Sequence, residues 1–490
     1  MTLARRRSIG LLALAVLALA PRLVLVGLLA HAGHVPYAYE HGVIAENLAT
    51  GRGFVIEFLG SEGPTSQQGP LYPAALAIFY RLFGVGSNAA LVTMQLVQCL
   101  AASVTAVCVA LLGWSWFPRY PIAGWLAGLV AALHPTHIYA VTHIQVVVWV
   151  TMLLAVMLVL VSAPAARHRI VYGIGAGLAA GALVLCEPIL ALAVPPAVLL
   201  YGLRHGNGDH VIQSLLRVVF RAALVGGVCA AVLAPWIGRN WHVHRELVFV
   251  KSTFGYAFWQ GNNPLSQGTD KIPTREALAD RRAHDGTVAQ RLAALQESRL
   301  AAHYIDDVAL TSADYTQLSV LGEPARSREL GRRARQFITD NPSAYVRLCL
   351  QRLRYFLLFD QTNPKAADPI YKAMTVSWLI VASVGLLASL RHWRVLWPAF
   401  VIFAAVTLFH TLTITSVRFR LPIEPLSFVW TAAAFAPALQ HVIAALPAPR
   451  WAAPRRDATP QPQLHTLPDG AAPAISPAGE SPYPPLRKAG

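Results

Sequence analysis

The sequence predicts an all-α polytopic membrane protein, and two observations indicate this class. The 490 residues are 55% hydrophobic and only 13% charged, which is too little charge to cover the surface of a soluble protein of this size. Apolar runs of about 20 residues, the length that crosses a bilayer as a helix, recur along the chain. Membrane β-strands would alternate apolar and polar residues, and these runs do not.

About ten apolar segments are expected to cross the membrane as helices. Their approximate limits are 8–30, 88–112, 121–140, 143–163, 170–186, 188–204, 218–237, 371–390, 394–412 and 424–444. The first contains Pro21 and Arg22 without a clear cleavage site, so it is interpreted as a retained helix and not as a signal peptide. The cysteines form no CxxC pair, which indicates buried thiols and no disulfide or metal framework.

The basic residues predict which side of the membrane each loop faces. The net charge is +16, and arginine clusters precede the first span and follow the fourth, sixth and eighth. The positive-inside rule places these loops in the cytoplasm, and an even number of spans puts both termini there. Because the basic residues are spread over separate loops, we expect no nucleic-acid partner.

This topology leaves two large segments on the outer side, 31–87 and 238–370. We therefore divide the chain into an N-terminal transmembrane region over 1–237 with 31–87 as its catalytic loop, a helical outer segment over 238–370, and C-terminal membrane helices over 371–446. The sequence LYPAALAIFYRLFG is predicted to form an interfacial helix, and Asn341-Pro342 is predicted to break a helical stretch. Residues 447–490 are rich in Pro, Ala and Ser, which predicts a disordered cytoplasmic tail.

The first outer loop carries an acidic residue directly after the first span. Glu40 lies in YAYEHG and Glu46 in AENLATGRGF. On a helix these two positions do not share a face, so only one of them is expected to point into a cleft. A carboxylate in a partly desolvated pocket can act as a general base on a hydroxyl or amine. The alternative is a solvated loop acid, while the loop glycines are interpreted as turns.

Arginines at the outer ends of two spans suit an anionic ligand. Arg239 follows the seventh span in APWIGRNWHVHRELVFVKSTFGYAFWQGNNP, and Arg418 and Arg420 lie in FHTLTITSVRFRLPIEPL between the ninth and tenth. A guanidinium binds a phosphate through two parallel hydrogen bonds. The alternatives are snorkelling toward headgroups for Arg239, and interfacial anchoring with an Arg–Glu pair for the other two.

Other polar residues are weaker candidates. His134, His137 and His143 lie in one outer turn, but Pro135 interrupts the helical spacing that would favour a metal site, and no acid completes the set. Glu187 is a further outer acid with a candidate place in the cleft. The turn Gly261-Asn262-Asn263-Pro264 offers amides that are able to bind polar groups.

The chain resembles the polytopic glycosyltransferases of the GT-C fold, specifically bacterial family 39-like members related to protein mannosyltransferases and the lipid A aminoarabinose transferase. The resemblance covers residues 40–425 and is carried by YEHGVIAENLATGRGF, GPTSQQGPLYPAALAIFYRLFG, APWIGRNW…FGYAFWQGNNP and H…RFRLPIEP, in that order. It implies inverting transfer of a sugar from a polyprenyl-phosphate donor to a lipid, glycan or protein acceptor. It also implies the bacterial plasma (inner) membrane, with the site facing the periplasm.

The resemblance also implies roles for single residues. Glu40 fills the position of the acid that acts as base, although many relatives carry Asp-Glu where this chain has Tyr39-Glu40. The lipid phosphate is expected to meet three arginines, and five further residues are expected to contact substrate. The arginines are Arg239, Arg418 and Arg420, and the substrate residues are Tyr39, Asn262, Asn263, His410 and Glu187. Some members bind a divalent metal, which leaves a metal open here.

Two other classes remain as alternatives at this stage. A transporter or flippase of lipid-linked sugars would share the arginines and the apolar groove, but it would need polar residues deep in several spans, and the spans are largely free of them. A ligase or polymerase that uses a diphosphate lipid would also share them.

Overall fold

The computed structural model describes residues 3–163, 169–203, 211–272, 286–300 and 303–445. The predicted tail over 447–490 lies outside the described residues. Residues 1–443 form one compact unit, which holds every element discussed below apart from the last residues of α20. The domain boundaries expected inside this unit stay a prediction.

The apolar segments form helices. Among the described residues, six helical stretches are long and apolar enough to cross a membrane, and four shorter apolar ones accompany them. The predicted apolar segments form the following elements: α1 (Leu3–His31), α4 (Asn88–Trp116), α5 (Pro121–Leu133), α6 (Pro135–Ala140), α7 (Val147–Ser162), α8 (Arg169–Cys186), η1 (Pro188–Ala193), α9 (Val194–Leu203), α10 (Val211–His244), α18 (Pro369–Ser389), η4 (Leu390–His392), α19 (Trp393–Leu412) and α20 (Glu424–Ala445). The all-α membrane class is therefore confirmed, whereas the number of about ten spans stays a prediction.

Small residues let these helices approach one another closely. Helix α4 begins where the Ser87 side chain accepts a hydrogen bond from Ala90 N, as an N-cap does. Along its contact with α5, a Cβ atom on Gly124 would lie 2.6 Å from the Ala110 carbonyl oxygen, so only glycine fits there. Close backbone approach through small residues is the usual way in which membrane helices pack. The resulting core joins α4, α5, α7, α8 and α20.

Residues 31–87, predicted to be the first outer loop and named so here, contain more structure than the sequence predicted. It forms α2 (Tyr39–Ala49), β1 (Val55–Phe58), β2 (Ser61–Pro64) and α3 (Leu71–Phe83), and α3 coincides with the predicted interfacial helix. Strands β1 and β2 pair in antiparallel fashion, from Val55 opposite Pro64 to Phe58 opposite Ser61. The two turn residues, Leu59 and Gly60, have φ of 51° and 80°, the left-handed pair that tight hairpins use.

The second outer segment is mainly helical, as expected. Its elements are α11 (Phe254–Gly261), β3 (Lys271–Ile272), α13 (Val288–Leu300), β4 (His303–Tyr304), α14 (Ile305–Ala309), α15 (Ser312–Ser319), α16 (Glu323–Asp340), α17 (Pro342–Leu357) and η3 (Pro364–Ala367). A further short helix, η5 (Val417–Phe419), lies between α19 and α20. The break at Asn341-Pro342 is confirmed, because α16 ends at Asp340 and α17 begins at Pro342.

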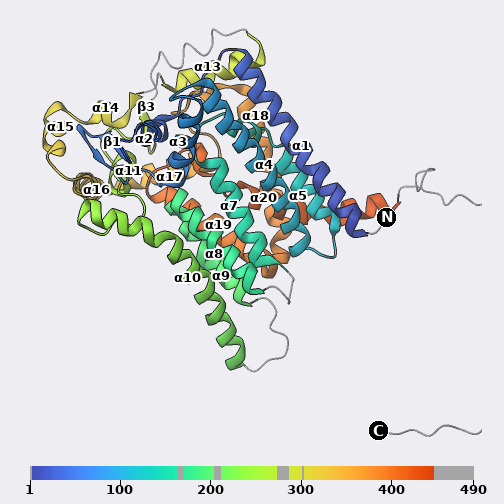
Figure 1. The fold of residues 1–490 in the computed structure, drawn as a ribbon. Coiled ribbons are helices and arrows are strands. Elements are labelled where there is room, and N and C mark those ends of the chain that lie inside the picture. The colour runs from blue at the N-terminus through green and yellow to red at the C-terminus, as the bar shows by residue number, and fades with distance from the viewer. Residues whose placement is uncertain (1–2, 164–168, 204–210, 273–285, 301–302, 446–490) are drawn as a thin grey trace, which may run out of the picture. The chain divides into compact units, whose positions relative to one another are not determined.

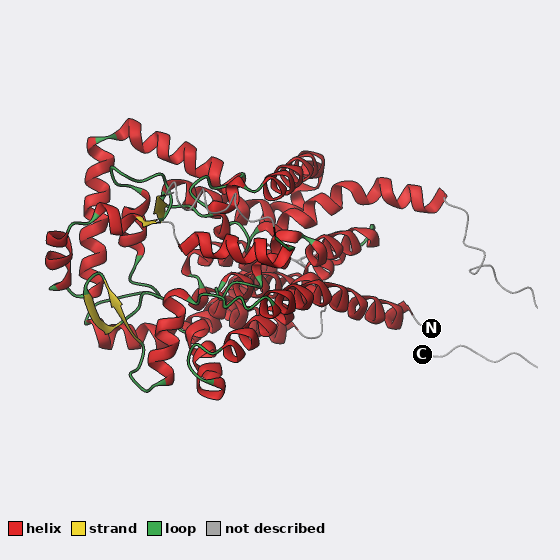
Figure 2. Cartoon of the chain, turned by 90° about the horizontal axis from the view of Figure 1, so that it is seen from above, coloured by secondary structure: helices red, strands yellow, loops and turns green. Residues whose placement is uncertain are grey.

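The two outer segments share a hydrophobic core of their own. Ile56 and Phe58 of the hairpin pack with Trp259 of α11 and Leu330 of α16. The Arg326 guanidinium also donates a hydrogen bond to the Phe58 carbonyl oxygen. The hairpin therefore lies beside α15 and α16 (Figure 1), and its two strands stand out from the surrounding helices (Figure 2).

The loop after the hairpin packs against the end of α8 with no room for a side chain. A Cβ atom on Gly69 would overlap the Leu185 carbonyl oxygen. We expect Gly69→Ala to lower the free energy of unfolding by about 1–3 kcal/mol, because the backbone of α8 has to move. Denaturant unfolding of the full chain in detergent checks this. Gly63→Ala is the matched control, since its Cβ would meet nothing within 4 Å, and an equal loss in both variants would contradict the prediction.

Candidate functional site

A cavity of about 700 Å³ lies where the outer segments meet the ends of the membrane helices. The membrane side of its wall is apolar and includes Val147 and Val150 of α7, Ile189 of η1, and Val406 and Phe409 of α19. The lining from α2, the hairpin, the loop after α10, α11 and α14 combines charged and amide side chains with apolar residues such as Ile56, Phe58 and Phe258. A cavity of this size, with an apolar part at the helix ends and charged groups elsewhere in its lining, suits an amphipathic ligand.

Helix α2 presents the candidate base to this cavity. Tyr39 and Glu40 both line it, while Glu46 is exposed on another face of the same helix. This is the difference between the two acids that their spacing predicts. Tyr39 has a left-handed backbone with φ of 49°, which is costly for a bulky residue and turns the chain sharply into α2.

Two basic side chains reach the cavity, each beside a carboxylate. Lys251 Nζ lies 2.9 Å from Glu187 Oε2, and Arg418 Nη2 lies 3.9 Å from Asp270 Oδ2. All four residues line the cavity. Both cations also act on the same neighbour, His41, where burial first and the two positive charges second lower the imidazole pKa to about 3. Lys251 and Arg418 therefore share one region of positive potential.

A further acid, Asp306 of α14, also lines the cavity. Its Oδ1 accepts a hydrogen bond of 3.3 Å from Gln260 Nε2, which also lies 2.7 Å from the Tyr256 hydroxyl. Burial raises the pKa of Asp306 above its ordinary value. The pKa of Tyr256 is raised well above its ordinary value by burial first, then by Asp306 and, more weakly, by Glu40 and Asp270. Tyr256 therefore sits among three cavity carboxylates.

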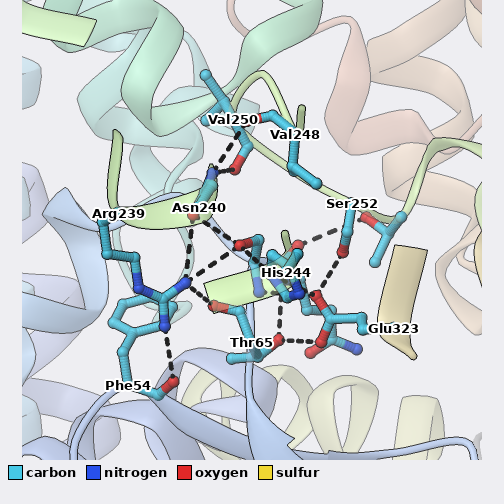
Figure 3. Close-up of polar contacts among 12 residues, drawn as sticks. Phe54, Thr65, Arg239, Asn240, His244, Val248, Val250, Ser252 and Glu323 are labelled. Atoms are coloured by element: carbon cyan, nitrogen blue, oxygen red, sulfur yellow. Dashed lines mark hydrogen bonds and ion pairs between the residues drawn. The ribbon is translucent and has the colours of Figure 1, made fainter. Parts of the chain in front are cut away.

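Arg239 does not line the cavity. Its side chain instead binds the loop that carries Phe54 and Thr65 (Figure 3). Its guanidinium donates to the carbonyl oxygens of Thr65 at 2.6 Å and Phe54 at 3.3 Å, and it stacks over the Trp236 ring at 4.8 Å. These contacts use the donors that the sequence analysis assigned to a lipid phosphate. Arg239 instead fastens the first outer loop to the end of α10.

The same loop is fixed by a buried carboxylate from α16 (Figure 3). Glu323 accepts hydrogen bonds from the Thr65 hydroxyl at 2.6 Å, the Ser66 amide at 2.7 Å and the Ser252 hydroxyl at 2.6 Å. The Ser66 hydroxyl also lies 2.8 Å from His244 Nε2. Since Gln67 follows this anchor and lines the cavity, the network sets the position of one cavity wall.

Arg420 is likewise engaged inside the protein. Its Nη1 donates to the carbonyl oxygens of Phe356, at 3.1 Å, and of Leu357, and its Nε lies 3.2 Å from Glu424 Oε1. It does not line the cavity. The Arg–Glu pair that the sequence analysis held as the alternative is therefore present, and of the three predicted arginines only Arg418 reaches the cavity.

Glu424 also supplies the acid that the histidine cluster lacked in sequence. His134, His137 and Glu424 place one ligand atom each within 4.8 Å of one another, a donor set that suits zinc. However, Glu424 Oε2 already pairs with His137 Nε2 at 3.0 Å, and none of the three lines the cavity. Any metal held there would lie outside the cavity lining, so we assign it no part in the chemistry of the cavity.

Asn262 and Asn263 have structural partners as well. Asn262 Nδ2 donates to the carbonyl oxygens of Phe258 at 2.8 Å and Thr413 at 3.0 Å, and Asn263 Nδ2 donates to that of Trp259 at 2.9 Å. Both close the C-terminal end of α11 and neither lines the cavity. His410 does line it, but its Nδ1 lies 2.9 Å from the Ile414 carbonyl oxygen and its ring is stacked on Phe419.

The structure therefore brings together Tyr39, Glu40, Glu187, His410 and Arg418, and leaves Arg239, Arg420, Asn262 and Asn263 outside. Four charged cavity residues were not predicted from the sequence, namely Glu57, Lys251, Asp270 and Asp306. Lys251 gave one weak signal, because it is the only lysine in a segment otherwise notable for its aromatics. Glu57 has no helical or motif spacing to mark it, and Asp270 and Asp306 lie among many charged residues of a long segment.

Comparison with known proteins gives matches among solved structures. No protein-family model and no curated relative matches the chain. One similar structure is the archaeal oligosaccharyltransferase AglB from Archaeoglobus fulgidus, in complex with an inhibitory peptide and a dolichol-phosphate, at 13% identity over 90% of this chain with a TM-score of 0.49. The chain spans about half of that protein, 52% of its length.

A second is ArnT from Cupriavidus metallidurans bound to undecaprenyl phosphate, at 14% identity over 88% of this chain and 79% of the other, with a TM-score of 0.39. Both TM-scores are below 0.5. We therefore transfer no residue role from either structure and base the function on the cavity.

Proposed function

We propose that the protein is an inverting membrane glycosyltransferase that moves a sugar from a polyprenyl-phosphate donor to an acceptor at the outer face of a bacterial inner membrane. The observation that carries this proposal is the composition of the cavity wall. An apolar side formed by membrane-helix ends suits a prenyl chain, two cations suit its phosphate, and a cavity carboxylate suits a proton-transfer step. Dolichol-phosphate and undecaprenyl phosphate, present in the two similar structures, belong to the same class of lipid.

Lys251 and Arg418 would hold the donor phosphate. Each is now paired with a carboxylate, Glu187 or Asp270, and an incoming phosphate would compete for those pairs. Arg418 is the more available of the two, because 3.9 Å from Asp270 is too long for a hydrogen bond. The negative charge of a departing phosphate would be stabilised by both cations in a site shielded from bulk water.

Glu40 would act as the general base. Among the described residues no hydrogen bond or ion pair is found for its carboxylate, whereas Asp306 is bonded to Gln260 and Glu187 to Lys251. The acceptor oxygen or nitrogen forms a bond to the anomeric carbon as the bond from that carbon to the phosphate oxygen breaks. The acceptor proton passes to Glu40, and the bonding electron pair leaves with the phosphate. Attack from the face opposite the phosphate inverts the anomeric centre.

Formation of a glycosidic bond tests this proposal against the transporter alternative. The full chain is reconstituted in liposomes with undecaprenyl-phosphate hexoses and a panel of lipid, glycan and peptide acceptors, and products are identified by mass spectrometry. A new glycoside together with free undecaprenyl phosphate is the expected result. Movement of the lipid-linked sugar across the bilayer with no glycoside formed would overturn the proposal.

Replacing the phosphate-binding arginine is expected to weaken donor binding. Arg418→Gln removes a charged hydrogen-bond donor to phosphate, so affinity for undecaprenyl phosphate should fall about tenfold to a hundredfold. Native mass spectrometry or fluorescence titration in nanodiscs measures the change. Arg332→Gln is the control, since that exposed guanidinium of α16 pairs only with its own helix. Unchanged affinity in Arg418→Gln would remove this residue from the site.

A further inference from the structure

Three buried polar atoms in the cavity wall have no hydrogen-bond partner in the part of the chain that the structure describes. They are His41 Nδ1, Gln67 Oε1 and Gln145 Nε2, and all three residues line the cavity. Their exposed fractions are only 7%, 9% and 8%. Leaving a buried donor or acceptor unpaired costs about 1–3 kcal/mol, so such atoms indicate groups that a ligand satisfies.

The three atoms come from separate segments that the fold brings to the lining of one cavity. His41 follows Glu40 on α2, Gln67 follows the Ser66 anchor, and Gln145 precedes α7. The His41 ring packs on Tyr72 at 4.9 Å, and Tyr72 packs on Trp149 of α7 at 5.4 Å. The Tyr72 hydroxyl bonds Gln98 Oε1 at 2.8 Å, and Gln98 Nε2 in turn donates to the His143 carbonyl oxygen at 2.9 Å. Tyr72 and Gln98 therefore connect the His41 ring to the turn that carries Gln145.

The chemistry of these atoms differs from that of the phosphate-binding pair. Gln145 Nε2 can only donate and Gln67 Oε1 can only accept, while a neutral imidazole nitrogen does one or the other according to its tautomer. A phosphate oxygen can satisfy the donor but would face the Gln67 oxygen with a second lone pair. A hydroxyl group both donates and accepts, so a set of uncharged donors and acceptors suits the hydroxyls of a sugar.

We propose that His41, Gln67 and Gln145 form a subsite that binds the hydroxyl groups of the donor sugar, next to the phosphate held by Lys251 and Arg418. The proposal rests on the function proposed above and assigns the sugar end of the donor to a particular wall. Since Glu40 adjoins His41 in sequence and lines the same cavity, this places the sugar in the part of the cavity that also holds the proposed base.

The subsite also distinguishes the donor from the spent carrier. Undecaprenyl phosphate without a sugar would keep its contacts with Lys251 and Arg418. It would leave His41 Nδ1, Gln67 Oε1 and Gln145 Nε2 without hydrogen-bond partners. A site that hydrogen-bonds substrate hydroxyls strongly disfavours an analogue that lacks them. The sugar-bearing lipid should therefore bind more tightly than the bare lipid phosphate, and the carrier should leave more readily after transfer.

Binding of two lipid classes to the full chain in nanodiscs tests the subsite. The probes are undecaprenyl phosphate and undecaprenyl-phosphate glucose, mannose and galactose, and the variants are Gln145→Leu, Gln67→Leu and, as a control, Gln336→Leu on the exposed face of α16. In the wild type, at least one sugar-bearing lipid should bind about tenfold or more tightly than the bare lipid. Each cavity variant should reduce this preference about fivefold to tenfold and leave the affinity for the bare lipid within about twofold.

The outcomes separate the subsite from the function on which it rests. If the wild type binds neither lipid class, the proposed function fails. If it binds both classes equally, or if Gln145→Leu and Gln67→Leu keep the wild-type preference, the subsite assignment fails alone. A loss of affinity for the bare lipid in these variants would also overturn it, because the atoms would then bind phosphate. Near-native binding of the bare lipid shows in the same measurement that each variant is folded.

Discussion

Glu40→Gln is expected to abolish glycosyl transfer while donor binding persists. The amide keeps the size of the side chain but cannot accept the acceptor proton, and loss of a general base typically lowers kcat by roughly 10²- to 10⁴-fold. Since Lys251 and Arg418 are untouched, the affinity for undecaprenyl phosphate should stay within about twofold of the wild type. Turnover in proteoliposomes and lipid binding in nanodiscs, measured on one preparation, give the two values.

Two matched variants decide whether the effect belongs to this carboxylate. Glu46→Gln changes the exposed acid of the same helix and should keep wild-type turnover. Asp306→Asn changes the cavity acid that is bonded to Gln260 and should retain most of the activity. If Asp306→Asn is inactive and Glu40→Gln is active, the base is Asp306, and Glu40 has no catalytic role.

Glu323→Ala is expected to be the most destabilising single substitution discussed here. It removes the acceptor of three short hydrogen bonds and leaves the Ser66 amide and two hydroxyls without their buried partner. Removing one member of a buried charged network typically costs about 3–5 kcal/mol. Denaturant unfolding of the full chain in detergent micelles should show a loss of that order.

Glu329→Ala on the same helix is the control for this prediction. Its carboxylate is bound by Arg332 and Arg333 at the surface of α16, and exposed pairs are usually worth less than about 1 kcal/mol. A loss for Glu323→Ala no larger than that of Glu329→Ala would show that the loop is held by other contacts. The hydrophobic packing of the hairpin on α11 and α16 would then be the main anchor.

Much of the fold follows from the sequence, because hydropathy and helix breakers act locally. The amphipathic helix α3 and the break at Asn341-Pro342 appear where the pattern predicts them, and the apolar segments form helices. The predicted span 121–140 is divided into α5 and α6 at His134, before Pro135, and the predicted span 188–204 begins as the 3₁₀ helix η1 before α9. The hairpin escaped prediction because its turn is Leu59-Gly60, in which Leu59 adopts the left-handed conformation that Asn or Gly usually takes. Packing of β1 on the outer helices stabilises a turn that its own residues do not favour.

The site was less predictable, because it depends on contacts between distant segments. Arg239, Arg418 and Arg420 look equivalent in sequence, since each flanks an apolar segment. Arg239 binds Thr65 and Phe54, Arg420 binds the end of α17, and only Arg418 is left facing the cavity. Glu40 was predictable for the opposite reason, because its place beside the end of the first span is a local property.

The cavity lining draws on residues from Tyr39 of α2 to Pro422 just before α20. During synthesis α2 leaves the ribosome long before α19 and the Arg418 segment. A nascent chain therefore carries Glu40 before it has Arg418 and the part of the apolar wall that α19 supplies. A chain that ends before Arg418 should be unable to hold the lipid phosphate that we propose as its ligand.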